Sequence, residues 1–276
     1  MSARRVKMPT VVTITIFVAI AFSTIYPIFY VTATALRTDA DYRNSPIGLP
    51  GSFTLDNVIG AWTDAGLSGY VVNSLVVVIS AVILLTILAS LAGYAFAHLN
   101  LPGSRTLLAI VVGSMIVPPA VIMIPVFKVI LEAGLLNSRL GLVLVYASLN
   151  LPFTIFLTTT YMRGIPGELF EAARVDGAST LRAFTLIALP LSRPGLATAA
   201  TLNFLVLWNE LLFALVLLPG DESRTVTVGI SVIQGQYLTS VPTVAAGLLS
   251  SIVPPLLVFA FLQRDLARGL TSGAVK

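Results

Sequence analysis

Cysteine is absent from this chain of 276 residues, and histidine occurs only once, at His98. The absence of cysteine excludes disulfide scaffolds, iron–sulfur clusters and thiol nucleophiles, and it removes the usual zinc ligands. A single histidine argues against a histidine-based metal site and against a Ser/His/Asp triad within the chain. We therefore expect no catalytic residue and no metal site, and we expect His98 to be interfacial and non-catalytic.

Charged residues are also scarce. Asp, Glu, Lys and Arg make up only 10% of the chain, whereas hydrophobic residues make up 57%. Soluble domains average about 25% charged residues and about 45–50% apolar residues. A chain of this composition has too little polar surface to cover a globule in water, so we expect it to lie in a lipid bilayer.

Six apolar regions are long enough to cross a bilayer, which takes about 20 residues in a helix. They lie at about 11–32, 71–97, 106–127, 140–162, 195–218 and 243–263. The alternation of polar and apolar residues typical of a membrane β-barrel is absent. The sequence therefore predicts an all-α, polytopic membrane protein, with six transmembrane helices in a single domain over residues 1–276.

Lys and Arg are unevenly distributed between the two sides of the predicted helices. Of these 16 residues, eleven lie in the two tails and in the segments 98–105 and 163–194, and five lie in the other three connecting segments. The positive-inside rule then places both termini and the 163–194 loop in the cytoplasm. Because membrane topology accounts for the basic balance, we expect no nucleic-acid partner.

The N-terminus imitates a secretion signal, because Arg4, Arg5 and Lys7 precede an apolar run. Cleaved signal sequences have apolar cores of about 7–15 residues, and the run at about 11–32 is longer. We expect a retained helix that anchors the chain.

The loop at 163–194 is longer than a connecting turn requires, and its residues predict a helix-turn-helix. Pro166 suits the first turn of a helix, and Asp176-Gly177 suits its end, where a left-handed residue is needed. Ser179 can cap a second helix that runs to about Leu189 and ends at Pro190. Such a hairpin could brace the bundle at the membrane surface, or it could dock into a groove of a soluble partner.

The same loop carries a resemblance to a known family. The run Glu171–Ser179, followed by Phe184 and by Leu189-Pro190-Leu191, resembles the EAA loop of ABC-importer permeases. Other motifs resemble the carbohydrate-uptake branch of that family, specifically its second, maltose-type permease subunit. They are Val117-Pro118-Pro119, Gly134–Asn137, Leu151-Pro152-Phe153, Trp208-Asn209-Glu210 and the tail Arg268–Lys276.

The resemblance implies the type I importer permease fold in the cell (inner or cytoplasmic) membrane. It implies a heterodimer with a homologous permease, two ATPase subunits that bind ATP and Mg²⁺, and an extracytoplasmic binding protein that delivers a sugar or an oligosaccharide. No cofactor is expected in this chain, which has no Walker-type phosphate-binding motif. The resemblance further implies that the loop couples to the ATPase through Glu168, Glu171, Ala172, Ala173, Asp176, Gly177, Ala178 and Ser179.

Glu210 is the main polar group within a predicted span, with Asn203 and Asn209 nearby. A carboxylate in a membrane needs a partner or water. On a continuous helix Asn203 and Glu210, seven residues apart, would share a face. We expect these residues to lie beside the translocation path or to hold helices together. Trp208 could likewise stack on a sugar ring or simply pack.

Pro118 and Pro119 break the backbone ladder of the third predicted span. They therefore allow a gate or a static kink, and Pro254-Pro255 in the sixth span raises the same alternatives. On the outer side, the segment 219–242 is long and polar enough to reach a docked binding protein through Gln234, Gln236 and Tyr237. An ordinary solvated loop would look similar.

Three rival functions stay open on the sequence alone. The cargo could be another solute, such as a glycerol phosphate, a polyol or an amino acid. A secondary transporter driven by an ion gradient would normally show paired charges within the membrane and an internal repeat, and Glu210 stands almost alone. An intramembrane enzyme would need His, Cys or paired Asp residues that are missing here.

Overall fold

The computed structural model describes residues 10–236 and 240–274, except for the side chains at 10, 11, 234, 236 and 264–274. All regular elements of these residues are helices. By contacts, the chain divides into two compact units. Unit 1 comprises Met1–Leu67 and Ile230–Ser251, and unit 2 comprises Ser68–Gly229 and Ile252–Lys276.

Unit 1 holds α1 (Thr10–Ala35), α2 (Asp39–Asn44) and α3 (Asp56–Thr63), and it shares α13 (Val226–Gln236) and α14 (Val241–Ala274) with unit 2. The segment that connects α1 to α3 is built around Arg37, which is only 1% exposed. The guanidinium donates to the carbonyl oxygens of Ser45, Pro46 and Gly48. Because a buried guanidinium must use its donors, Arg37 fixes this loop against the end of α1.

Asp41 closes the same loop from the other side. Its Oδ2 accepts hydrogen bonds from the backbone N–H groups of Gly51, at 2.9 Å, and Ser52, at 3.2 Å. Desolvation alone would raise the pKa of Asp41, but these hydrogen bonds outweigh it and hold the pKa below its ordinary value. The carboxylate is therefore the form that stabilises the loop.

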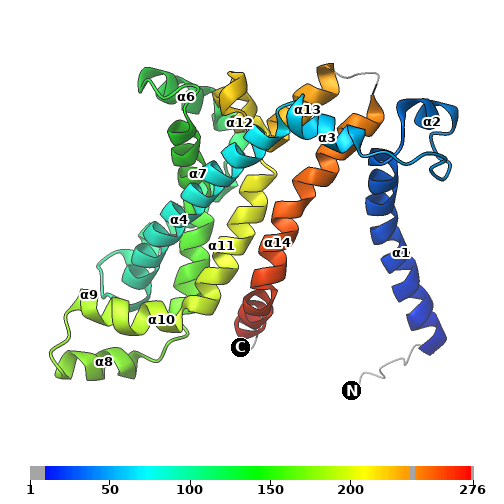
Figure 1. The fold of residues 1–276 in the computed structure, drawn as a ribbon. Coiled ribbons are helices and arrows are strands. Elements are labelled where there is room, and N and C mark those ends of the chain that lie inside the picture. Colours follow the sequence, from blue (N-terminus) through cyan, green and yellow to red (C-terminus); the bar gives the residue numbers. More distant parts are fainter. Residues whose placement is uncertain (1–9, 237–239, 275–276) are drawn as a thin grey trace. The chain divides into compact units, whose positions relative to one another are not determined.

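Unit 2 contains the helices that position the candidate site (Figure 1). In chain order they are α4 (Leu67–His98), α5 (Ser104–Gly113), η1 (Ser114–Ile116), α6 (Pro119–Glu132), α7 (Arg139–Met162), α8 (Gly167–Val175), α9 (Thr180–Ala183), η2 (Phe184–Ala188), α10 (Leu189–Leu191), α11 (Arg193–Trp208), α12 (Leu212–Leu217) and η3 (Asp221–Ser223). α7 packs against α5, α6, α11 and α12. It therefore forms the centre of the unit.

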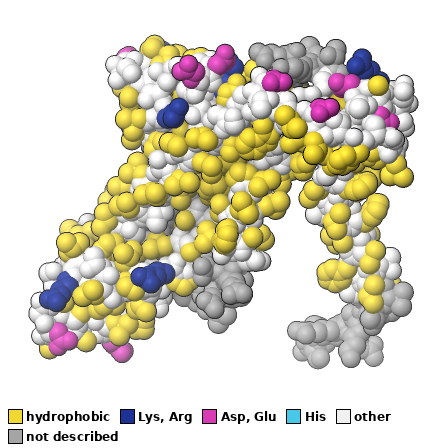
Figure 2. Space-filling model, viewed as in Figure 1, with side chains coloured by type: hydrophobic (Ala, Val, Ile, Leu, Met, Phe, Trp, Pro, Cys, Tyr) yellow, Lys and Arg dark blue, Asp and Glu magenta, His cyan; other side chains and the backbone are white. Residues whose placement is uncertain are grey.

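Four helices within the described residues are long and apolar enough to cross a membrane. They are Val12–Ala35, Leu67–His98, Arg139–Met162 and Val241–Gln263. A fifth candidate is the pair Ser104–Ile116 and Pro119–Glu132, which bends by 99°. On the face drawn in Figure 2, hydrophobic side chains cover much of the length of the helices, and the charged side chains that are coloured lie mostly toward helix ends. This distribution fits a membrane-spanning protein.

Two predicted spans are interrupted. In the third, Pro118 is extended (φ −63°, ψ 132°) and Pro119 starts α6, so the predicted kink is a complete break. In the fifth, α11 ends at Trp208 and α12 starts at Leu212. α11, with 16 residues, extends about 24 Å, less than the roughly 30 Å of a bilayer core. The count of six spans stays a prediction. Pro254 and Pro255 lie inside the continuous helix α14.

Close approach to α7 depends on two glycines. A Cβ on Gly195 in α11 would come within 2.4 Å of Cγ of Tyr161, and a Cβ on Gly93 in α4 would come within 2.8 Å of Cγ2 of Thr158. Real Cβ atoms do not approach other atoms so closely. A side chain at position 195 would therefore force the whole ring of Tyr161 to move. Small residues at these crossings therefore set the distance between helices.

We expect Gly195→Ala to lower the stability of the protein by about 1–3 kcal/mol, because it overpacks the contact with Tyr161. The measurement is the thermal unfolding midpoint in mild detergent. Gly69→Ala is the matched control, since Gly69 also lies in a helix and has nothing within 4 Å of its Cβ position. Equal midpoints for the two variants would contradict this packing.

Candidate functional site

The helix-turn-helix predicted at 163–194 is present, and its turn is formed by hydrogen bonds along the backbone. Pro166, predicted for the first turn, is the N-cap of α8, which ends at Val175 with Asp176 as its C-cap. Gly177 has φ 78°, as predicted for a left-handed residue. Ala178 N–H donates to the carbonyl of Ala173 at 2.8 Å, and Gly177 N–H donates to that of Arg174 at 3.1 Å. This pair of bonds is a Schellman motif, which requires the left-handed residue.

The second helix of the loop starts as predicted and ends differently. Oγ of Ser179 accepts a hydrogen bond from the N–H of Arg182, which confirms the predicted cap. The prediction that the helix ends at Pro190 is wrong. The run passes through a π-helical turn at η2 and reaches Leu191 in α10. Proline lacks a backbone donor, and Pro190 directly follows the π-helical turn, in which the N–H of Leu189 donates to the carbonyl of Phe184.

The two helices of the loop are fixed to the ends of α4 and α7 by a buried cluster, which we name the aromatic joint. Its members are Tyr94, Met162, Ile165, Phe170, Ala183, Phe184 and Ala188. The ring centroid of Tyr94 lies 5.9 Å from that of Phe170 and 5.3 Å from that of Phe184. Because aromatic packing of this kind resists rotation of the partners, α8 is held as part of the helix bundle.

His98 completes the aromatic joint at the end of α4. Its ring centroid is 4.0 Å from that of Phe170, and its Nε2 lies 2.8 Å from the carbonyl oxygen of Met162. His98 therefore links α4, α7 and α8. The sequence predicted the position of His98 at this end of its helix but not these contacts. The feature that could have indicated them is Phe170, a large apolar residue between the acidic residues of α8.

The opposite face of α8 is open. Glu168, Glu171 and Asp176 are exposed, and these three carboxylates form no ion pair within the part of the chain that is described. Val175 is 88% exposed. Of the other residues expected at this site, Ala172, Gly177 and Ser179 are exposed, and Ala173 and Ala178 are partly buried. An acidic, small-residue surface on a rigid support is suited to insertion into a partner's groove.

Glu210 lies in the break between α11 and α12 rather than on a helix face. Its Oε1 accepts from the N–H of Phe213 at 2.9 Å, and its Oε2 accepts from the N–H of Ala214 at 3.1 Å. Oε2 also accepts from the hydroxyl of Tyr146 on α7 at 2.8 Å. Glu210 thus caps α12 and ties it to α7. The expectation that Asn203 and Glu210 share one helix face is wrong, because the helix ends at Trp208.

The other polar residues near this break have different surroundings. Asn203 is buried and donates to Oγ1 of Thr154 on α7 at 2.9 Å, so it links two helices. Trp208 is buried, and its ring stacks on that of Phe204 with centroids 5.6 Å apart. Asn209 is exposed and donates to the carbonyl of Leu205. In this structure Trp208 and Asn203 pack inside unit 2, while Asn209 faces outward.

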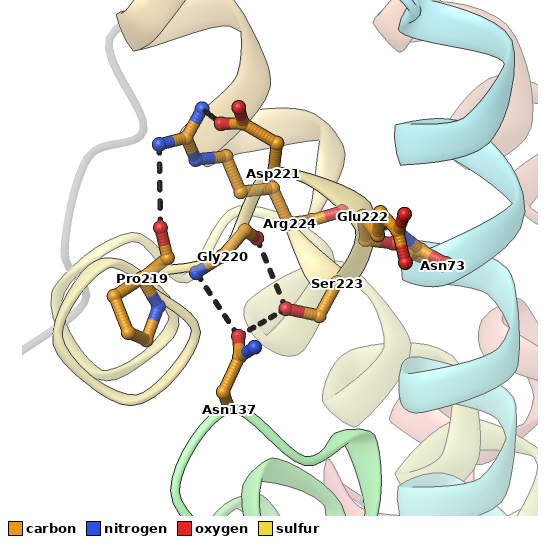
Figure 3. A network of polar contacts seen from close by, with 8 residues as sticks. All are labelled: Asn73, Asn137, Pro219, Gly220, Asp221, Glu222, Ser223 and Arg224. Carbon is orange, nitrogen blue, oxygen red and sulfur yellow. Dashed lines mark hydrogen bonds and ion pairs between the residues drawn. The ribbon is translucent and has the colours of Figure 1, made fainter.

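A second polar network lies at the N-terminal end of α7, away from the 163–194 loop (Figure 3). Asn137 has φ 57°, and its backbone N–H donates to the carbonyl of Leu217 at 2.8 Å. Its Oδ1 accepts from the N–H of Gly220 at 3.0 Å and from the hydroxyl of Ser223. Asn137 therefore fastens the segment after α12 to the loop between α6 and α7.

The same segment is also fastened to α4. Nδ2 of Asn73 donates to the carbonyl oxygens of Glu222 at 2.8 Å and Arg224 at 2.9 Å. Arg224 in turn forms an ion pair with Asp221. The first part of the predicted docking segment 219–242 is thus an ordered platform. Tyr237 and the side chains of Gln234 and Gln236 lie outside the described residues.

We expect Asn137→Ala to destabilise unit 2 by about 2–4 kcal/mol, because it removes two hydrogen bonds and strains a left-handed residue. Asn137→Asp keeps the acceptor oxygen and tolerates the left-handed conformation, so it should keep most of the stability. The thermal unfolding midpoint in detergent measures both. An equal loss for the two variants would mean that the acceptor does not hold this platform.

Comparison with known proteins adds family relationships. The family model described as "Binding-protein-dependent transport system inner membrane component" matches residues 86–272. The diacetylchitobiose uptake system permease protein NgcG of Streptomyces coelicolor is 33% identical over 254 residues, covering 91% of this chain and 84% of that protein. The melibiose/raffinose/stachyose import permease protein MelC of Bacillus subtilis is 31% identical and is matched over the full length of both chains.

A solved structure shows the same fold. It is that of a bacterial ABC transporter involved in the import of the acidic polysaccharide alginate, and it superimposes with a TM-score of 0.82. The match covers 96% of this chain and 98% of the other chain, at 24% sequence identity. The fold predicted from the EAA-like loop is therefore confirmed.

Proposed function

Because this chain belongs to the family of binding-protein-dependent transport system inner membrane components, we propose that it translocates a sugar or an oligosaccharide across the cell membrane. As the permease of an ABC importer it is a transport subunit, and a separate subunit hydrolyses ATP. The uptake of diacetylchitobiose by NgcG and of melibiose, raffinose and stachyose by MelC supports a carbohydrate cargo. A glycerol phosphate, a polyol or an amino acid is the alternative cargo.

The working importer consists of this chain, a homologous permease, two ATPase subunits and an extracytoplasmic binding protein. Both termini and the 163–194 loop face the cytoplasm, and the excess of Lys and Arg on that side supports this orientation. ATP and Mg²⁺ are bound by the ATPase subunits. Gln234, Gln236 and Tyr237 contribute to docking of the binding protein, beyond the platform that Asn137 and Asn73 hold in place.

The observation that carries this proposal is the two-sided character of α8. Its acidic face, with Glu168, Glu171 and Asp176, is open to a partner. Its apolar face, with Phe170, is locked to α4 and α7 by the aromatic joint. Closure of the ATPase dimer then moves α8 and the helix bundle together. Directional transport follows when ATP and the loaded binding protein favour different states of the bundle.

The breaks in the two interrupted spans supply a gate. The first break lies at Pro118, directly before α6, and the second lies at residues 209–211, between α11 and α12. α12 contacts both α6 and α7, so the two breaks are mechanically connected. We assign the translocation path to this region, with Asn203 and Trp208 as packing residues behind it. Irregular backbone at membrane depth is tolerated only where protein or water satisfies it.

Purification of the tagged chain in mild detergent tests this function. We expect mass spectrometry to identify an ATPase subunit and a second permease in the purified complex. The binding protein that belongs to the complex should then be stabilised against heat by a sugar and not by glycerol phosphate, polyols or amino acids. A folded chain that purifies without any ATPase would refute the importer, and stabilisation by another solute would refute the cargo.

A further inference from the structure

A groove of about 860 Å³ lies at the end of α4, α5 and α7, beside the loop that carries α8. Its lining is mixed, and its apolar side chains include Phe96, Leu108, Val112 and Phe156. Two arginines, Arg105 and Arg163, also line the groove. The groove thus combines a hydrophobic surface with a concentrated positive charge.

No carboxylate of the described residues pairs with these two arginines. The lining contains neither Asp nor Glu. Arg105 and Arg163 are both exposed, and neither forms an ion pair within the described residues. Guanidinium groups bind phosphate well, because their donors match two of its oxygens at once. The charge in the groove therefore calls for an anion from outside this chain.

The apolar wall decides what kind of anion fits. A small aqueous anion would gain nothing from contact with Phe96, Leu108 and Phe156, whereas a phospholipid would bury its acyl chain there. Arg105 lies in the first turn of α5, and Arg163 directly follows α7. In a bilayer, both would lie near the place where an apolar helix leaves the hydrocarbon core. Lipid headgroups occupy this depth.

We propose that the groove binds an anionic phospholipid, with its phosphate held by Arg105 and Arg163 and its acyl chain along Phe96, Leu108 and Phe156. The lipid comes from the cytoplasmic leaflet, which rests on the proposed orientation of the chain. The site adjoins the aromatic joint, because Leu99 and Asn100 line both this groove and a smaller cavity against Phe170. The lipid is therefore in a position to support the coupling loop.

The test is native mass spectrometry of the complete importer, titrated with phosphatidylglycerol or with phosphatidylcholine. We expect phosphatidylglycerol to be retained more strongly, and we expect Arg105→Gln combined with Arg163→Gln to weaken its binding about tenfold. The control is Arg182→Gln combined with Arg193→Gln, which removes two exposed charges of the same loop that do not line the groove. Arg105→Lys combined with Arg163→Lys keeps the charge but loses the paired donors of the guanidinium, so its binding should lie between that of the unaltered protein and that of the Gln pair.

Several results would overturn this site. Equal losses in the two Gln pairs would show a general charge effect, and displacement by millimolar inorganic phosphate would show a site for a free anion. Binding by the permease pair alone, but not by the complete importer, would show that the ATPase covers the groove. Selective lipid binding by a chain that never associates with an ATPase would instead support the site and refute the proposed function.

Discussion

Combining Glu171→Lys with Gly177→Arg is expected to release the ATPase from the purified importer while the second permease stays bound. Glu171 is exposed on α8, so its replacement reverses a charge at the proposed contact. Gly177 has φ 78°, where a residue with a side chain is strained by about 1–2 kcal/mol. A large cationic side chain there also breaks the turn that presents α8. We expect sugar uptake to fall to background.

The chain offers a matched control for this double variant. Glu132 is exposed at the end of α6, and Gly134 follows it with φ 70° and nothing within 4 Å of its Cβ position. Glu132→Lys combined with Gly134→Arg therefore makes the same chemical changes in the loop between α6 and α7. This control should retain the ATPase. Loss of the ATPase from both variants, or from neither, would contradict the role of the loop.

Replacing Glu210 with alanine is expected to abolish uptake and to destabilise unit 2 by about 2–4 kcal/mol, since it removes a helix cap and the partner of a buried hydroxyl. Tyr146, which donates to Glu210, is only 1% exposed. Glu210→Gln keeps one acceptor oxygen, so its loss should be smaller. Unfolding in detergent and ATP-driven uptake in proteoliposomes measure the two effects.

Tyr146→Phe separates the two roles of Glu210. It removes only the hydroxyl that donates to Oε2 and leaves the cap on α12 intact. A double-mutant cycle of Tyr146→Phe with Glu210→Gln then isolates the contact between α7 and the break. We expect coupling of about 0.5–3 kcal/mol. Uptake driven by an ion gradient without ATP, and lost in Glu210→Gln, would instead support an ion-coupled transporter.

Local features of the loop were predictable because short-range backbone geometry determines them. The left-handed Gly177 and the cap at Ser179 follow from hydrogen bonds between residues no more than five apart. The aromatic joint was not predictable in this way. His98 and Met162 are 64 residues apart, and only packing of the bundle brings them together.

The interrupted spans show a second limit. Pro118-Pro119 indicated a disturbed helix, but the 99° bend depends on how α5 and α6 pack against α7. For Glu210, hydropathy indicated one continuous span. The helix ends earlier because the carboxylate accepts hydrogen bonds from the N–H groups of Phe213 and Ala214. The spacing of hydrophobic residues in the sequence does not indicate such hydrogen bonds.

Site-specific photo-crosslinking from α8 tests the coupling loop most directly. The chain has no cysteine, so Val175→Cys, at a position that is 88% exposed, attaches a photoreactive probe at one place only. In membranes that take up sugar, the probe should form an adduct with the ATPase, and a probe at Ala133→Cys, in the loop after α6, should not. A transporting importer in which the Val175 position never crosslinks to the ATPase would contradict the account.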